Sequence, residues 1–277
     1  MTPFRALLIV CISLLSAFHA QANAPASFIV GVLPVHSARV LAERYEPLRA
    51  YLEKSLEQPV RIESAADFRR FHERTANGDF DLAITAAHLA RVAQKDAGLL
   101  PLAQFAPDHD LVLFSAAERP LANIQELKGK QLAVIDRLAI TVMAALNHLS
   151  TLGLEVDQDY QAVEHKTPTS AAHSVASGLS LLGVSARQSL LQLPEDLRRK
   201  VVAHKTLADI PAFVLIAKAG MDKARAERLK NLLLAFQNEP EGIDFLGRVG
   251  YSKLMPANEA ALKRVDAYLK ETRKALK

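Results

Sequence analysis

Short apolar runs alternate along the chain with stretches whose apolar residues recur at helical spacing. The runs with the length and alternation of strands are 28–35, 59–65, 79–86, 99–106, 110–116, 131–135, 160–166, 179–185, 200–207 and 212–220. The first helical stretch places five large apolar residues on one face: Leu41, Tyr45, Leu48, Leu52 and Leu56. From residue 222 onward the pattern is that of helices broken by proline and glycine. Strands alternating with helices predict an α/β fold with parallel sheets covered by helices.

The first 22 residues have the pattern of a secretory signal peptide. A basic Arg5 precedes an apolar segment, residues 6–18, and small residues follow at A-x-A spacing. We expect cleavage after Ala22, because a cut after Ala24, the alternative, would leave Pro25 next to the cleaved bond. No later run is long enough to cross a bilayer, so we expect an exported, periplasmic protein with no membrane insertion of the mature chain.

Composition narrows the function further. The only cysteine, Cys11, lies in the predicted signal peptide, so the mature chain is expected to form no disulfide, thiolate metal site or cysteine nucleophile. The net charge of +4 is small and dispersed, which argues against nucleic acid as a partner. Half of the residues are apolar, enough for the core of one large or two medium domains.

The segment QLAVIDRLAITVMAALNHL, residues 131–149, reads as a strand, a tight turn and a helix. A helix that begins just after a strand presents unpaired N–H groups and the positive end of its dipole, which together favour an anion. Arg137 could hold a carboxylate or phosphate in a bidentate manner, and Thr141 adds one hydroxyl. The rest of the first turn is apolar, so the pattern leaves open whether an anion binds there.

Loops that follow the predicted strands supply the other candidate ligand-binding residues. They are His36, Ser37, Thr85, His88, Thr169, Ser170 and Ser185. For the hydroxyl residues, helix capping is an equally good interpretation. His36 and His88 could approach a cleft from the same side and bind an anion when protonated. No spacing typical of a metal site or of a catalytic motif occurs, so we expect no metal, no cofactor and no catalytic residue.

Three further phrases carry a family resemblance: GVLPVHSARVLAERYEPLRAYLEKSLEQPV, NGDFDLAITAAHLARV and PLANIQELKGKQLAVID. With them, nearly the whole mature chain resembles the phosphate/phosphonate-type periplasmic solute-binding proteins of ABC transporters. The most specific part is RYEPLRAYLE together with its spacing to GDFDLA.

The resemblance implies a two-lobed periplasmic-binding-protein type 2 fold, each lobe a mostly parallel sheet flanked by helices. Lobe I would comprise residues 26–116 and 209–277, and lobe II residues 117–208. The ligand would lie between the lobes, at the carboxyl ends of strands. The expected function is to capture a small, anionic ligand, phosphonate-like or phosphate-like, and deliver it to the membrane permease of an ABC transporter. We expect the protein to be a monomer.

Family members carry Ser-Thr-Ser where this chain has Ala139, Ile140 and Thr141. Because two hydroxyls are replaced, we expect phosphonates to bind weakly. The resemblance leaves two alternative functions. The same lobes could serve a detached sensor whose occupancy is read by the ectodomain of a membrane histidine kinase. Less favoured is an enzyme on the same fold, for which removal of His36 or His88 should reduce the rate more than the binding.

Overall fold

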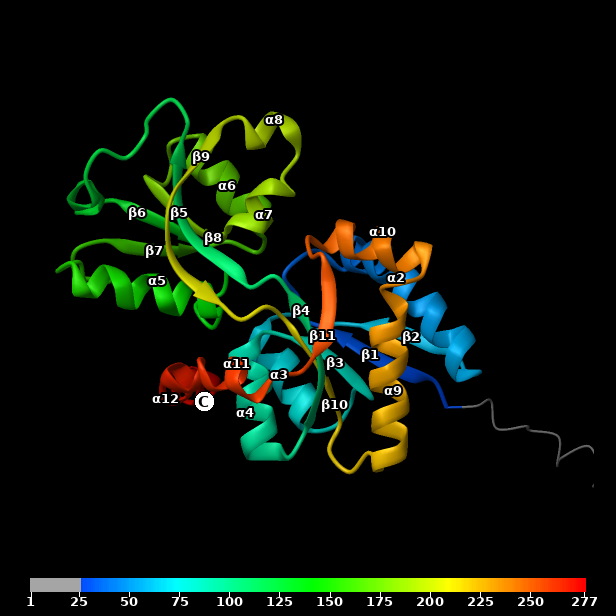
Figure 1. Cartoon of the computed structure of the whole chain (residues 1–277). Coiled ribbons are helices and arrows are strands. Elements are labelled where there is room, and N and C mark those ends of the chain that lie inside the picture. The colour runs from blue at the N-terminus through cyan, green and yellow to red at the C-terminus, as the bar shows by residue number, and fades with distance from the viewer. Residues whose placement is uncertain (1–25) are drawn as a thin grey trace, which may run out of the picture.

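The computed structural model describes residues 26–277, which form two lobes side by side (Figure 1). Each lobe is built on one β-sheet with helices on both faces, so the predicted two-lobed α/β fold is confirmed. The predicted signal peptide, residues 1–22, lies outside the described residues. Within residues 26–277, no helix is both long enough and apolar enough to cross a membrane.

Lobe I contains a six-stranded sheet in the order β11-β4-β10-β3-β1-β2. Its strands are β1 (Phe28–Val32), β2 (Val60–Glu63), β3 (Leu82–Thr85), β4 (Leu100–Ala106), β10 (Val214–Ala217) and β11 (Lys253–Pro256). Its helices are α2 (Ala38–Leu56), α3 (Phe68–Ala76), α4 (Ala87–Ala97), α9 (Lys223–Phe236), α10 (Pro240–Val249), α11 (Glu259–Lys263), the 3-10 helix η2 (Asp266–Tyr268) and α12 (Leu269–Leu276). The apolar face of α2 packs with α9 and α10 on one side of the sheet, and α3 and α4 cover the other.

Lobe II contains a five-stranded sheet in the order β7-β6-β8-β5-β9. Its strands are β5 (His109–Ala116), β6 (Gln131–Val134), β7 (Gln161–Glu164), β8 (Leu182–Ala186) and β9 (Val201–Ile210). Its helices are the 3-10 helix η1 (Ile124–Leu127), α5 (Ile140–Thr151), α6 (Pro168–Ala176), α7 (Arg187–Leu191) and α8 (Glu195–Arg198). Alternation in β5 sends Leu111 and Leu113 toward the α5 side and Val112 and Phe114 toward the α6 side.

The two sheets are mixed rather than mostly parallel. Lobe I combines parallel pairs around β1 with antiparallel pairs around β10, and lobe II combines parallel pairs around β6 with antiparallel pairs around β5. The reason is the way in which the chain passes between the lobes. Each passage continues directly from a strand of one sheet into a strand of the other, so no helix turns the chain back into a parallel strand.

Two short links connect the lobes, residues 107–108 between β4 and β5 and residues 211–213 between β9 and β10. The links lie side by side, because His109 pairs with Ile210 and the Phe105 N–H donates to the Phe213 carbonyl. The predicted boundary after residue 116 assigned the strand 110–116 to lobe I. That assignment is wrong, because β5 pairs with β8 and β9 in lobe II.

The C-terminal part also differs from the prediction of helices alone. A short strand, β11, pairs with β4 at the edge of the lobe I sheet. Helix α12 then lies beside both lobes (Figure 1). Arg273 forms a bidentate ion pair with Asp96 of α4, and Asn147 of α5 donates to Glu271 at 3.4 Å. The C-terminal helix therefore bridges lobe I and lobe II.

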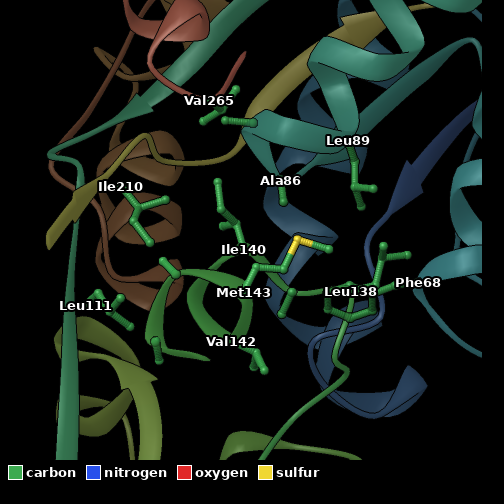
Figure 2. Close-up of a cluster of buried hydrophobic side chains, with 14 of the residues drawn as sticks. Phe68, Ala86, Leu89, Leu111, Leu138, Ile140, Val142, Met143, Ile210 and Val265 are labelled. Carbon is green, nitrogen blue, oxygen red and sulfur yellow. The ribbon is translucent and has the colours of Figure 1, made fainter. Parts of the chain in front are cut away.

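One apolar cluster continues from lobe I into lobe II. In Figure 2, Leu138, which precedes α5, lies beside Phe68 of α3, and Ile140 and Met143 of α5 lie near Ala86. Leu138 and Ile140 are buried, with 4% and 6% of their surfaces exposed. The two lobes are thus in contact through a packed apolar seam, and not only through the covalent links.

Candidate functional site

A cavity of about 90 Å³ lies between the lobes. Leu33 and Val35 at the end of β1 line it from lobe I, and Ile140 and Val184 line it from lobe II. Phe213, in the second link, contributes an aromatic face. The space suits a solute of only a few non-hydrogen atoms, held mostly by apolar walls with a small number of polar groups.

Arg44 is the cation of this cavity. It extends from α2, next to the apolar stripe that fixes the helix on its sheet, and it is half-buried. Its Nη1 donates to Nε2 of His36 at 3.0 Å and to Oε1 of Gln192 in lobe II at 2.6 Å. No carboxylate of residues 26–277 forms an ion pair with it. The guanidinium therefore keeps donors that can meet an anion.

His36 is held as a neutral acceptor beside Arg44. A guanidinium can only donate, so Nε2 of His36 carries the lone pair and Nδ1 the proton. Burial and, secondarily, the positive charge of Arg44 lower the pKa of His36 to about 4. At neutral pH, His36 can thus offer a ligand a hydrogen bond but no charge.

His109 and Tyr251 form a second polar pair on the wall. The Tyr251 hydroxyl lies 2.5 Å from Nε2 of His109. Burial lowers the pKa of His109 to about 4, against the opposing effect of Asp108 and Asp110. Burial also raises the pKa of the Tyr251 hydroxyl well above its usual value. Both groups are therefore neutral at pH 7.

Four further hydroxyl groups join the amides of Gln188 and Gln192 in the polar lining. They belong to Tyr45, Thr141, Ser185 and Ser189. None of the four side-chain hydroxyls has a hydrogen-bond partner among residues 26–277. Burial raises the pKa of the Tyr45 hydroxyl far above its usual range, so it acts as a neutral donor. A bound solute can accept hydrogen bonds from lobe I and lobe II at once.

The N-terminus of α5 borders this cavity but is largely closed by its own side chains. Its cap residue, Ala139, provides no side-chain hydrogen bond, and Leu138, Ala139 and Ile140 are buried in the apolar seam. Nε2 of His88 donates to the Leu138 carbonyl across the seam at 2.8 Å, which leaves the buried Nδ1 with no partner among residues 26–277. Thr141 is the residue of this first turn that offers a hydroxyl to the cavity.

Three of the predicted site residues meet at the cavity: His36, Thr141 and Ser185. Ser37 instead caps α2 through Val40 and lines an adjoining groove of about 610 Å³, here called the outer groove. His36 lines both the cavity and the outer groove, so it stands between them.

The structure places the other predicted residues away from the cavity. Thr85 and His88 are buried in lobe I, with 2% and 0% of their surfaces exposed. Arg137 forms a bidentate ion pair with Asp157, at 2.8 and 3.0 Å, on the surface of lobe II. Thr169 does not line the cavity, and Ser170 completes the capping box of α6 with Thr167. These residues are therefore not part of the cavity lining, because strand ends and helix starts can also face a core or solvent.

Sequence reasoning missed Arg44, Tyr45, His109, Gln192 and Tyr251 as residues of the cavity. Arg44 and Tyr45 lie inside a long amphipathic helix, where a charged residue is normally solvated. Tyr45 also belongs to the stripe that predicts the core. The sequence carries no signal that separates Arg44 from its exposed neighbours, because only the second lobe turns it into a cavity residue.

Three histidines make stability depend on acid pH. Burial lowers the pKa of His36, His88 and His109 to about 4 each, whereas in the unfolded chain an imidazole titrates near 6.5. The unfolded state therefore binds more protons below that value. The free energy of unfolding should be at its full value above about pH 6.5 and fall by several kcal/mol as the pH drops toward about 4.

Urea unfolding at neutral and acid pH measures this loss. His88→Gln keeps an N–H that can reach the Leu138 carbonyl but does not titrate, so it should lessen the pH dependence. The matched control is His173→Gln, at an exposed position on α6, which should not lessen it. Equal pH dependence in all three proteins would contradict a buried neutral His88.

Among residues 26–277, no three histidine, cysteine, aspartate or glutamate side chains gather in a way that could hold a metal ion. The lining thus combines one guanidinium, neutral imidazoles, hydroxyls and apolar walls. Such a lining can bind and desolvate a small anion.

The family model described as "ABC transporter, phosphonate, periplasmic substrate-binding protein" matches residues 30–262. Solved structures share the fold. One is a binding protein component of an ABC phosphonate transporter from Pseudomonas aeruginosa, with a TM-score of 0.79 and 13% identity, over 91% of this chain and 89% of that one. Another is PhnD1 from Prochlorococcus marinus in complex with methylphosphonate, with a TM-score of 0.78 and 15% identity, over 90% and 99%. A third is a Xanthomonas citri protein bound to chloride ion, with a TM-score of 0.74 and 18% identity, over 90% and 99%.

Proposed function

Because the chain belongs to the phosphonate-type periplasmic substrate-binding family of ABC transporters, we propose that it captures a small anionic solute in the cavity between its lobes and passes it to a membrane permease. The family predicted from the sequence is thereby confirmed. It is a family of transport proteins rather than of enzymes, and it implies a periplasmic location. The alternative of a detached sensor for a histidine kinase is not favoured.

The observation that carries the proposal is the half-buried guanidinium of Arg44 in that cavity. A charge removed from water is costly unless an opposite charge or good hydrogen bonds compensate it. Other arginines of the chain have such partners, as Arg137 has Asp157 and Arg91 has Asp266. Arg44 has only the neutral acceptors His36 and Gln192 among residues 26–277. A solute anion would supply the compensating charge.

Similar structures add support for an anion. Methylphosphonate is bound in the Prochlorococcus marinus protein and chloride in the Xanthomonas citri protein. For this chain we keep to the broader class, a small anion. Its α5 N-terminus is lined by Ala139 and Ile140, where phosphonate-binding members of the family carry hydroxyls.

We further propose that the solute enters through the outer groove while the lobes stand apart, and that closure seals it behind His36. The short links allow one lobe to rotate against the other. Closure brings Arg44 of lobe I to Gln192 of lobe II and Leu138 of lobe II to Phe68 of lobe I. A permease could then distinguish the loaded protein by its shape. We expect the protein to act as a monomer.

A thermal-shift screen followed by calorimetry tests the proposal. The panel contains chloride, acetate, methanesulfonate and methylphosphonate, with dimethyl sulfone as an uncharged analogue. A true ligand at a hundredfold over its Kd adds about 2.7 kcal/mol to the free energy of unfolding, which raises the Tm by several degrees. We expect at least one anion to do so and the sulfone not to. The proposal fails if no anion stabilises the protein and native mass spectrometry of the isolated protein detects no bound solute.

The choice of membrane partner needs a separate measurement. Cross-linking of the exported protein in cells should retrieve the transmembrane subunit of an ABC transporter. Retrieval of a histidine kinase instead would revive the sensor alternative without changing the binding site. Sedimentation of the purified protein with and without ligand would test the expected monomer.

A further inference from the structure

The cavity contains one fixed positive charge. Of the described residues that line it, Arg44 alone carries a full charge at neutral pH, and neither carboxylates nor lysines are present in the lining. The acids on either side of His109 do not alter this count. Asp108 is paired with Arg264 and Asp110 with Arg187, and neither acid lines the cavity.

The two imidazoles of the lining do not add to this charge. Nε2 of His36 accepts from the Arg44 guanidinium, so protonation there would set two cations against each other. Nε2 of His109 faces the Tyr251 hydroxyl, which burial keeps neutral, so no acidic partner holds a proton on it there. Burial keeps the pKa of both histidines at about 4. The hydroxyls of the lining donate hydrogen bonds without charge.

A solute with one negative charge balances Arg44, whereas a solute with two leaves one charge uncompensated. Apart from Arg44, the walls offer that second charge only neutral polar groups and apolar side chains such as Leu33, Ile140 and Val184. An isolated charge in such surroundings is driven to take up a proton instead. The binding form of any titratable anion would therefore be its monoanion.

We propose that this cavity selects singly charged anions with a small apolar substituent, and that it takes alkylphosphonates only in their singly protonated form. The proposal rests on the function proposed above and names the charge class of its ligand. The physiological ligand would then be a small organic monoanion that places its charged oxygens at Arg44 and the cavity hydroxyls. Its alkyl part would lie against the apolar wall.

Two anions of nearly equal shape distinguish the charge states. Methanesulfonate stays a monoanion across the accessible pH range. Methylphosphonate, like a phosphate monoester, exchanges its second proton within a unit or two of neutral pH. Calorimetric titrations of the full mature protein from about pH 5.5 to about pH 9 should give a constant affinity for methanesulfonate. The affinity for methylphosphonate should fall about tenfold for each pH unit above its second pKa, because the monoanion fraction falls at that rate.

The possible results distinguish a failure of this inference from a failure of the function on which it rests. Methylphosphonate binding that strengthens with pH, or that stays constant while the dianion accumulates, would overturn the monoanion proposal alone. Binding of methylphosphonate without any binding of methanesulfonate would overturn it too. Failure of every anion in the panel to bind would overturn the proposed function itself.

Two variants sharpen the test. Arg44→Lys keeps the single charge, so both pH profiles should keep their shapes even if both affinities fall. Ser189→Lys adds a second cation to the cavity wall and should remove the fall in methylphosphonate affinity at high pH. Circular dichroism shows whether each variant folds. If Ser189→Lys does not fold, the wild-type pH profiles still decide the question.

Discussion

Replacing Arg44 by methionine is expected to weaken the binding of small anions by about a hundredfold or more. Each charge-assisted hydrogen bond from a guanidinium to an anion contributes about 1.5–3 kcal/mol, and about 1.4 kcal/mol corresponds to a factor of ten in Kd. Loss of two such bonds exceeds the effect of any single hydroxyl of the lining. Methionine retains the length and much of the apolar volume of the arginine stem, so the packing of α2 on its sheet should survive. Calorimetry with an anion selected by the screen measures the change.

Arg39→Met is the matched control for this prediction. Arg39 lies on the same helix as Arg44 but is exposed, where it pairs with Glu43. The same substitution there removes one charge from α2 without touching the cavity, so the affinity should stay within about twofold. If Arg44→Met binds the anion as tightly as Arg39→Met does, Arg44 is not the anion contact.

Leu138→Asp should separate the lobes. The substitution places a carboxylate in the apolar seam beside Phe68, where the leucine is only 4% exposed. An unpaired buried charge costs several kcal/mol, and rotation of the lobes about their links allows water to reach it. We expect the radius of gyration from small-angle scattering to increase. The apparent anion affinity should fall about a hundredfold, because only the closed fraction of the protein can bind.

Leu152→Asp provides the comparison. Leu152 caps the C-terminal end of the same helix, α5, and is 42% exposed, so the added carboxylate stays in water. Neither the radius of gyration nor the anion affinity should change. Circular dichroism checks that the lobes of both variants remain folded. An unchanged radius of gyration and an unchanged affinity in Leu138→Asp would show that the seam does not control closure.

The period of the apolar residues predicted most of the elements, and the family resemblance added the two lobes, but neither predicted the pairing of strands. Residues 99–106 and 110–116 have similar alternation, and nothing in either run tells which sheet it joins. The predicted passage from lobe I to lobe II therefore falls later in the chain than the observed one. Strand β11 was missed because its four residues are stabilised by pairing with β4 at a sheet edge, not by their own pattern.

The sequence pointed to residues of the cavity lining only where the cavity meets the end of a strand or the start of a helix. His36 follows β1, Thr141 begins α5, and Ser185 lies near the end of β8, so local pattern identified them. Arg44 and Gln192 come together only when α2 of one lobe meets the end of α7 in the other. Contacts between distant segments leave no periodic trace in a single sequence.

Residues 136–141 have the backbone geometry of an anion site but serve a different purpose in this protein. Helix α5 still begins directly after a strand, as an anion-binding helix would. Its first turn instead provides the apolar surface on which the lobes meet, and the Leu138 carbonyl accepts a hydrogen bond from His88 of lobe I. In the proposed site, the anion is instead bound by Arg44, which reaches the cavity from lobe I. Restoring hydroxyls at this turn alone would therefore not recreate a dianion site.

The paired links at 107–108 and 211–213 have a consequence for experiments on motion. Two attachments that lie side by side define a line, so the expected relative movement of the lobes is a swing about that line. A single spectroscopic distance, measured between one label on α10 and one on α8, should then describe the whole movement of the lobes. A second distance, measured between labels at other positions, should change in proportion to the first.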